Sequence, residues 1–164
     1  MDTRKRTPVS LATILIFVTM LLPPSSFAGM RPDEVERFEE YKVRAEKGDT
    51  DGEFFYGNSY FFGFGVEKNK AKAIVWFHKA AGKGHPMAQR ALGRCYSKGD
   101  GVVKDEIEAY AYFNLAGVTR DEIREYLDIL EKTMTREEVA AAQRRTRELQ
   151  KEIEAKIAAK KAGK

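Results

Sequence analysis

GNSYFFGFGV at residues 57–66 and GRCYSKGDGV at residues 93–102 share glycine, tyrosine and valine at the same offsets. The correspondence continues on both sides, because identical residues recur at a spacing of 36 throughout residues 45–116. A fixed period of this length is the signature of a stacked-repeat fold, in which each unit exposes an apolar face that only its neighbours cover. We therefore expect two consecutive structural repeats.

Apolar residues recur at three- and four-residue spacing around these segments, which is the period of one helix face. One apolar stripe runs through residues 88–96. Another runs through residues 73–80 in the first copy and recurs at residues 109–116 in the second. The Gly-x-Gly-Val segment between the stripes supplies glycines that end one helix and turn the chain. Each repeat is therefore expected to be a pair of antiparallel helices.

The pattern predicts an all-α chain: a short right-handed α-α superhelix, or solenoid, of two helix-pair repeats with capping helices. Pro32 and Pro86 suit first-turn positions, and Asn69 and Asp105 stand where an N-cap side chain is needed. Seven helices and no strand are expected, at residues 32–47, 51–62, 70–82, 86–98, 105–117, 121–132 and 136–158. Reciprocal capping boxes are expected at Asp105/Glu108, Thr119/Glu122 and Thr135/Glu138.

The N-terminus has the pattern of a secretory signal peptide. Arg4, Lys5 and Arg6 precede a largely apolar run over residues 11–22, with small residues at positions 26 and 28. Cleavage after Ala28 would export the protein to the periplasm or the medium, and would lower its formal net charge from +4 to +2. The alternative is a retained membrane anchor, although this run is shorter than the ~20 residues of a spanning helix. No cysteine stands directly after it, so a lipid-anchored protein is not indicated.

Two repeats are fewer than the ~3 that stacked folds usually need, so the flanking helices are expected to cover the outer apolar faces. The expected segments are a signal peptide at 1–28, an N-terminal capping helix at 29–50, repeats at 51–86 and 87–122, and a C-terminal capping helix with a charged, Lys-rich helical tail at 123–164.

The residues that catalysis or metal binding would need are scarce. His78 and His85 are the two histidines and have no acidic or thiol partner at a recurring spacing, so no metal, cofactor or catalytic residue is expected. We expect His78 on a solvated helix face and His85 in a turn that leads into a helix. Ser59 and Ser97 lack the surroundings of an acyl-transfer nucleophile. Cys95 lies on an apolar stripe, which favours a buried, inert thiol.

Small residues and aromatics stand at fixed offsets in both copies. They are Gly57, Tyr60, Gly63, Gly65, Ala73, Trp76 and Ala80 in the first copy, and Gly93, Tyr96, Gly99, Gly101, Ala109, Tyr112 and Ala116 in the second. This pattern resembles the Sel-one-like repeat, a relative of the tetratricopeptide repeat, over residues 45–117. Residues 112–115 and 134–143 also look like the closing segment of short secreted bacterial members of that family.

The resemblance implies a superhelix that binds other proteins and has no chemistry of its own, which predicts a non-catalytic exported adaptor or scaffold. Its partner would be a protein or peptide, bound on the face of the first helices of each repeat. Some bacterial relatives are cysteine-rich and have been associated with penicillin binding, whereas this chain has only Cys95. Two alternatives stay open: a cell-envelope enzyme acting on peptidoglycan or β-lactams, and a structural subunit of a larger assembly.

Four phenylalanines exceed what the repeat requires, because polar residues stand at the same positions of the second copy. Phe54, Phe61, Phe62 and Phe64 correspond to Arg90, Ser97, Lys98 and Asp100. Either they pack on the N-terminal capping helix, which only the first repeat touches, or they form an exposed aromatic patch for a partner.

The C-terminal segment is basic, with nine basic and five acidic side chains over residues 136–164. Lys156, Lys160, Lys161 and Lys164 have no acidic residue among them. The segment is interpreted as a solvated, frayed helix end, and the alternative is weak attraction to an anionic envelope surface. Nucleic-acid binding is not expected, because no aromatics are interleaved in this tail.

Overall fold

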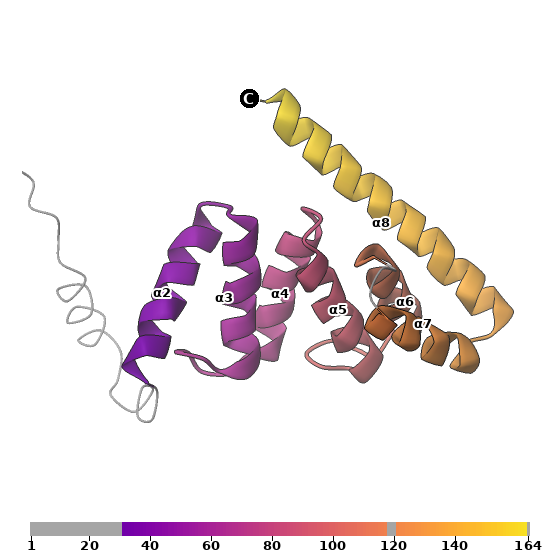
Figure 1. Ribbon diagram of the computed structural model, residues 1–164, viewed down its shortest axis with the longest axis horizontal. Coiled ribbons are helices and arrows are strands. Elements are labelled where there is room, and N and C mark those ends of the chain that lie inside the picture. Colours follow the sequence, from indigo (N-terminus) through magenta and orange to yellow (C-terminus); the bar gives the residue numbers. More distant parts are fainter. Residues whose placement is uncertain (1–30, 118–120, 164) are drawn as a thin grey trace, which may run out of the picture.

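Seven α-helices make up most of the described chain, residues 31–117 and 121–163 of a computed structural model (Figure 1). They are α2 (Pro32–Glu46), α3 (Thr50–Phe62), α4 (Lys70–Ala81), α5 (Pro86–Lys98), α6 (Glu106–Leu115), α7 (Asp121–Thr133) and α8 (Arg136–Ala162). No strand occurs in these two ranges. The all-α prediction is confirmed, and the largest shift of a helix end is at α8, which continues to Ala162. The predicted signal peptide lies outside the described residues.

Side-chain caps fix where two of the helices begin. At α4, the Asn69 side chain accepts a hydrogen bond from the Lys72 backbone N–H, 2.9 Å away. At α8, Thr135 and Glu138 exchange the reciprocal hydrogen bonds of a complete capping box. Both caps satisfy backbone N–H groups that have no partner inside the helix, so the two sequence predictions are confirmed.

The capping box predicted at the start of α6 is only half formed. The Asp105 side chain accepts from the Glu108 N–H at 3.0 Å, as expected. The Glu108 carboxylate does not return the bond and instead accepts from Arg145 Nε of α8, 2.6 Å away. A charge-assisted bond to a distant helix therefore replaces a local cap. The box predicted for residues 119 and 122 lies outside the described side chains.

The helices stand side by side in chain order, and each of α2 to α6 contacts the next one along the chain (Figure 1). Helices α3 and α4 form the first repeat, and α5 and α6 form the second. Helix α7 packs on α6, and α8 then turns back along the row and packs on α6 as well. None of the described helices is long and apolar enough to cross a membrane.

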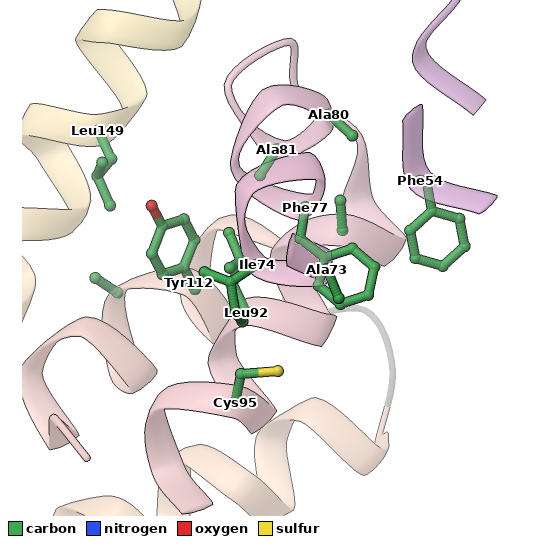
Figure 2. Packing of buried hydrophobic residues seen from close by; sticks show 12 residues of the cluster. Phe54, Ala73, Ile74, Phe77, Ala80, Ala81, Leu92, Cys95, Tyr112 and Leu149 are labelled. Carbon is green, nitrogen blue, oxygen red and sulfur yellow. The ribbon is translucent and has the colours of Figure 1, made fainter. Parts of the chain in front are cut away.

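The core is continuous across the repeats. Figure 2 shows Phe77 of α4 at its centre, with Phe54 of α3 towards one end and Leu149 of α8 towards the other. A second cluster joins α6 to α7 through Phe113 and Ile123, both almost fully buried. The flanking helices thus cover the outer faces of the repeats, as the low repeat number requires.

The glycine turns have the geometry that the sequence predicts. Gly63 and Gly99 end α3 and α5 in the left-handed conformation, with φ of 83° and 74°. At Gly65 an added Cβ would lie 2.2 Å from the backbone oxygen of Glu34, so only glycine lets this turn pass so close to α2. Val102 then folds back against the core, as expected.

The remaining repeat positions lie between or beside the paired helices. Tyr60, Trp76 and Tyr96 are partly buried, and Tyr112 is buried. Ala116 is partly buried at the end of α6. Of the small residues that define the repeat, Ala73, Ala80 and Ala109 have no exposed surface.

A mid-helix glycine in each repeat receives an aromatic ring from the partner helix. An added Cβ at Gly57 would lie 2.9 Å from ring carbons of Phe77, and one at Gly93 would lie 2.8 Å from a ring carbon of Phe113. Glycine costs a helix about 1 kcal/mol relative to alanine. Its presence here is explained by the ring, which lies where a methyl group would be.

Replacing Gly93 by alanine should therefore destabilise the protein, although alanine is the better helix former. Phe113 is fully buried, so the ring has no free space into which it can move. We expect the free energy of unfolding to fall by about 1–3 kcal/mol, measured by urea or thermal unfolding. In a double-mutant cycle with Phe113→Leu, the two changes should couple favourably. A single variant as stable as the wild type would contradict this account of the repeat.

Candidate functional site

Two hollows flank α3 on the side where α2, α3 and α5 lie next to one another. The hollow between α2 and α3 has a volume of about 330 Å³, and the hollow between α3 and α5 has a volume of about 240 Å³. Asn58 and Phe62 of α3 line both of them and form a ridge between the two. We call the two hollows and this ridge the α3 face. It includes the first helix of each repeat.

The four phenylalanines that the sequence singles out divide into two pairs. Phe54 is 5% exposed and stacks on His85, with ring centroids 4.8 Å apart. Phe61 is partly buried and packs near Phe77, at 6.0 Å between centroids. Phe62 and Phe64 are 56% and 50% exposed and stack on each other. The first pair belongs to the core between α3, α4 and α5, and the second pair stands on the α3 face.

The packing expected between this quartet and the N-terminal capping helix is made by other residues. Phe38 of α2 packs on Tyr56 and Tyr60 of α3, with ring centroids 5.0 and 5.5 Å apart. The side chains of Phe54 and Phe61 point instead into the core cluster that contains Phe77. The reason is the helical rotation along α3, since Tyr56 and Tyr60 occupy one side of the helix and Phe54, Phe61 and Phe62 occupy others. Phe64 lies beyond the end of α3.

Two further residues of the α3 face were not selected from the sequence. Phe55 is 39% exposed and stacks on Tyr41 of α2, at 5.1 Å between centroids. Asn58 is partly buried on the ridge, and its amide makes no hydrogen bond within the described residues. Comparison of the two repeats gives a signal for both, because Ala91 and Arg94 stand at the equivalent positions.

The α3 face is lined by more basic than acidic side chains. The basic residues that line its hollows are Arg31, Arg37, Arg90, Arg94 and Lys98. The acidic ones are Glu34 and Asp100, and each is already paired, with Arg31 and Lys70 respectively. The Lys70 ammonium holds the pKa of the Asp100 carboxyl below its usual range. Arg31 and Arg37 are paired in turn with Glu34 and Asp33 of α2, so the excess positive charge lies on the α5 side of this face, at Arg94 and Lys98.

His78 does not lie on a solvated helix face, and that prediction is wrong. Its Nδ1 lies 3.1 Å from the Tyr112 hydroxyl and its Nε2 lies 3.2 Å from the Tyr96 hydroxyl. Burial, with a smaller effect from the nearby Arg145 guanidinium, lowers the pKa of His78. The neutral ring joins α4, α5 and α6, which is a structural role.

Residues with catalytic or metal-binding potential are also engaged in structure. The His85 side chain accepts from the Ala88 N–H and caps α5, as predicted for a turn leading into a helix. Burial raises the pKa of the Cys95 thiol to about 11, which keeps it protonated. The hydroxyls of Ser59 and Ser97 each donate to a backbone oxygen of their own helix. Within residues 31–117 and 121–163, no three His, Cys, Asp or Glu side chains form a metal-binding group.

A second positive surface lies where the end of α8 approaches the turns before α3 and α5. Lys156, Lys160 and Lys161 of α8 line a hollow of about 370 Å³ together with Lys83 and Ile157. Lys83 is itself paired with the buried carboxylate of Glu53, at 2.7 Å. Lys156, Lys160 and Lys161 are exposed and have no ion pair among the described residues. We call these three residues the α8 lysines.

Helix pairs joined by glycine turns and stacked in chain order define an α-helical repeat protein. The Sel1 repeat family model matches residues 50–85 and 86–117, which is one match for each helix pair. Residues 50–117 therefore consist of two Sel1 repeats. The matched ranges begin one residue before the repeats predicted at 51–86 and 87–122.

Solved structures share the fold. A protective antigen of uropathogenic Escherichia coli strains, described as displaying an SLR fold, superposes with a TM-score of 0.72 at 26% identity, covering 91% of this chain and 31% of that one. A Sel1 repeat protein from Oxalobacter formigenes gives a TM-score of 0.54 at 29% identity, covering 58% of this chain and 40% of that one.

Curated relatives match over shorter segments. An ERAD-associated E3 ubiquitin-protein ligase component of Arabidopsis thaliana, HRD3A, is 36% identical over 72 residues, which are 43% of this chain and 11% of the relative. An exopolysaccharide production negative regulator of Rhizobium leguminosarum bv. viciae is 40% identical over 55 residues, 32% of this chain and 21% of the relative. The chain thus spans about a tenth to a fifth of these relatives.

Phe61 and Phe62 provide a test of the two environments on α3. Each is replaced by its counterpart in the second repeat, giving Phe61→Ser and Phe62→Lys. The first change removes a partly buried ring and should lower the free energy of unfolding by about 1–3 kcal/mol. The second removes an exposed ring and should change it by less than about 0.5 kcal/mol. Urea unfolding of both variants checks this, and equal losses would show that the face is assigned wrongly.

Proposed function

We propose that this protein is an exported, non-catalytic adaptor that binds another protein or peptide on the α3 face. The observation that carries the proposal is the pair of exposed rings, Phe62 and Phe64, at 56% and 50% exposure beside two hollows. A few aromatic anchors supply most of the binding energy of protein interfaces. The repeat itself does not need these rings, because Lys98 and Asp100 stand at the equivalent positions.

That the proposed adaptor is non-catalytic is inferred from the surroundings of its potentially reactive side chains. Cys95 is buried and protonated, His78 and His85 are held in structural hydrogen bonds, and the serine hydroxyls bond to their own helices. The relatives offer a parallel, since HRD3A is named as a component of a ligase. A role as one component among several fits a short helical repeat with an open face.

Export is proposed from the first 28 residues alone. A basic start, an apolar run and small residues before Gly29 form the pattern of a secretory signal peptide. The proposal therefore places the adaptor in the periplasm or outside the cell.

A second candidate function is weak attachment to an anionic surface through the α8 lysines. Three exposed ammonium groups lie within six residues of one helix, next to the hollow that Lys83 and Ile157 also line. Each basic residue near an anionic membrane contributes about 1 kcal/mol to attraction. Attachment at this end would leave the α3 face available to a protein partner.

Site-specific photo-crosslinking in cells tests the adaptor proposal. A photoreactive phenylalanine analogue at Phe62 should give a defined crosslinked protein, because this ring would lie inside the interface. The matched control is the same analogue at Val75 of α4, which is 55% exposed on the other helix of the repeat. In the same cells, the mature protein should begin at Gly29 by mass spectrometry.

The outcomes separate the proposal from its alternatives. A product at residue 62 and none at residue 75 supports the adaptor. Equal products at both positions, or none at residue 62, would contradict it. Hydrolysis of a β-lactam reporter or of peptidoglycan by the purified protein would favour the envelope-enzyme alternative. Crosslinks only to further copies of this chain would favour a structural subunit.

Vesicle sedimentation tests the anionic-surface candidate. Phosphatidylglycerol-containing vesicles should pellet the wild-type protein at low salt and lose it as salt rises. Replacing Lys156, Lys160 and Lys161 by glutamine should reduce the bound fraction at least threefold. The control replaces Arg144, Arg147 and Lys151 of α8, which are also exposed, and should retain most of the binding. Equal losses in the two variants would leave only a general charge effect and contradict the candidate.

A further inference from the structure

We propose that the α3 face takes an acidic, extended peptide segment that carries a large apolar side chain. This inference rests on the proposed function and specifies the chemistry of the partner. Its starting point is that positions where the two repeats differ most line the same hollow. Phe62 and Asn58 come from the first repeat, and their counterparts Lys98 and Arg94 lie across the hollow on α5. One repeat therefore supplies rings and the other supplies charge.

The charge of the hollow selects acidic partners. Arg94 and Lys98 are exposed and form no ion pair within the described residues. The acidic residue that lines this hollow, Asp100, is already held by Lys70. Carboxylates of a partner would thus meet two cations that form no direct ion pair with the described residues, while basic partners would be repelled.

The spacing of these cations favours an extended segment. Arg94 and Lys98 are four residues apart on α5, so their side chains start about 6 Å apart along one helix face. Alternate residues of an extended peptide lie about 6.6 Å apart and point the same way. Two acidic residues separated by one other residue would therefore reach both cations. The Asn58 amide, with no internal hydrogen bond, faces the same hollow and can bond to the peptide backbone.

The peptide is expected to carry an apolar side chain because apolar residues line the hollow and form the ridge. Phe61, Met87 and Ala91 line the hollow between α3 and α5 together with Phe62, which stacks on Phe64 of the neighbouring hollow. Hollows of about 240 and 330 Å³ are at or below the lower end of small-molecule pockets. They suit single side chains of a peptide. An aromatic or large aliphatic residue beside the acidic ones would cover the exposed rings.

A nucleic acid also combines negative charge with stacking groups, but the observations favour a peptide. Phe62 and Phe64 already stack on each other, at 5.5 Å between centroids, so a flat base would find one of their faces occupied. The formal net charge of the full chain is only +4. Binding of single-stranded nucleic acid is the competing result, and the test includes a probe that detects it.

Selection from a random displayed-peptide library tests the inference directly. The purified protein should enrich peptides in which Asp or Glu alternates around a Phe, Trp or Leu. A synthetic peptide of that consensus should bind in fluorescence anisotropy. Its counterpart with Lys in place of the acids, and its counterpart with Ala in place of the apolar residue, should each bind at least tenfold more weakly.

Variants connect the binding to the α3 face. Arg94→Glu with Lys98→Glu should weaken the consensus peptide at least tenfold, and Phe62→Lys should do the same through loss of the anchor contact. The matched control is Arg147→Glu with Lys151→Glu, an exposed pair at the same spacing on α8, which should leave binding within twofold. Circular dichroism confirms that each variant is folded.

The results distinguish failure of the acidic-peptide inference from failure of the adaptor function on which it rests. Enriched peptides that are not acidic, yet lose binding with Phe62→Lys, would overturn the inference and keep the adaptor function. Peptides whose binding is indifferent to Phe62→Lys and to the α5 charge reversal would count against the adaptor face itself. Stronger binding of a labelled oligothymidine than of the acidic consensus peptide would replace the peptide with nucleic acid and overturn the inference.

Discussion

The contact on which the rest of the fold depends is the ring of one helix seated on a glycine of its partner. Phe77 sits against Gly57 in the first repeat, and Phe113 sits against Gly93 in the second. Each ring is almost fully buried, at 1% and 0% exposure. The ring sets how closely the two helices of a repeat approach. Both repeats use the same contact within the helix pair, and their buried residues join in one core cluster.

That stacking determines which face is left open. Helix α8 turns back and packs on α6, where Leu149 joins the core beside Tyr112 and Arg145 pairs with Glu108. This contact covers part of the second-helix side. Helix α2 packs on α3, but neither α2 nor α8 fills the two hollows beside the exposed Phe62. The open face is thus a consequence of where the C-terminal helix packs.

The sequence predicts the parts of this fold that local chemistry controls. The period of 36, the caps at Asn69 and Thr135 and the left-handed Gly99 are local features, and all are found in the structure. Contacts between distant segments were missed. Glu108 leaves its predicted local cap for a residue 37 positions away, and His78 is partly buried between tyrosines of two other helices. Local spacing carries no information on such partners.

At the candidate site, too, the sequence predicts some features and misses those that depend on contacts between helices. Comparing the repeats identifies the positions that packing does not require, and that signal includes Phe55 and Asn58 as well as the phenylalanines first selected. The comparison does not distinguish the buried Phe54 from the exposed Phe62, because both are aromatic where the second repeat has a polar residue. The two residues are eight positions apart on α3. Phe54 faces the core between α4 and α5, whereas Phe62 is the last residue of α3 and stands next to the turn. The helix end, where packing stops, is therefore where an aromatic residue remains free to meet a partner.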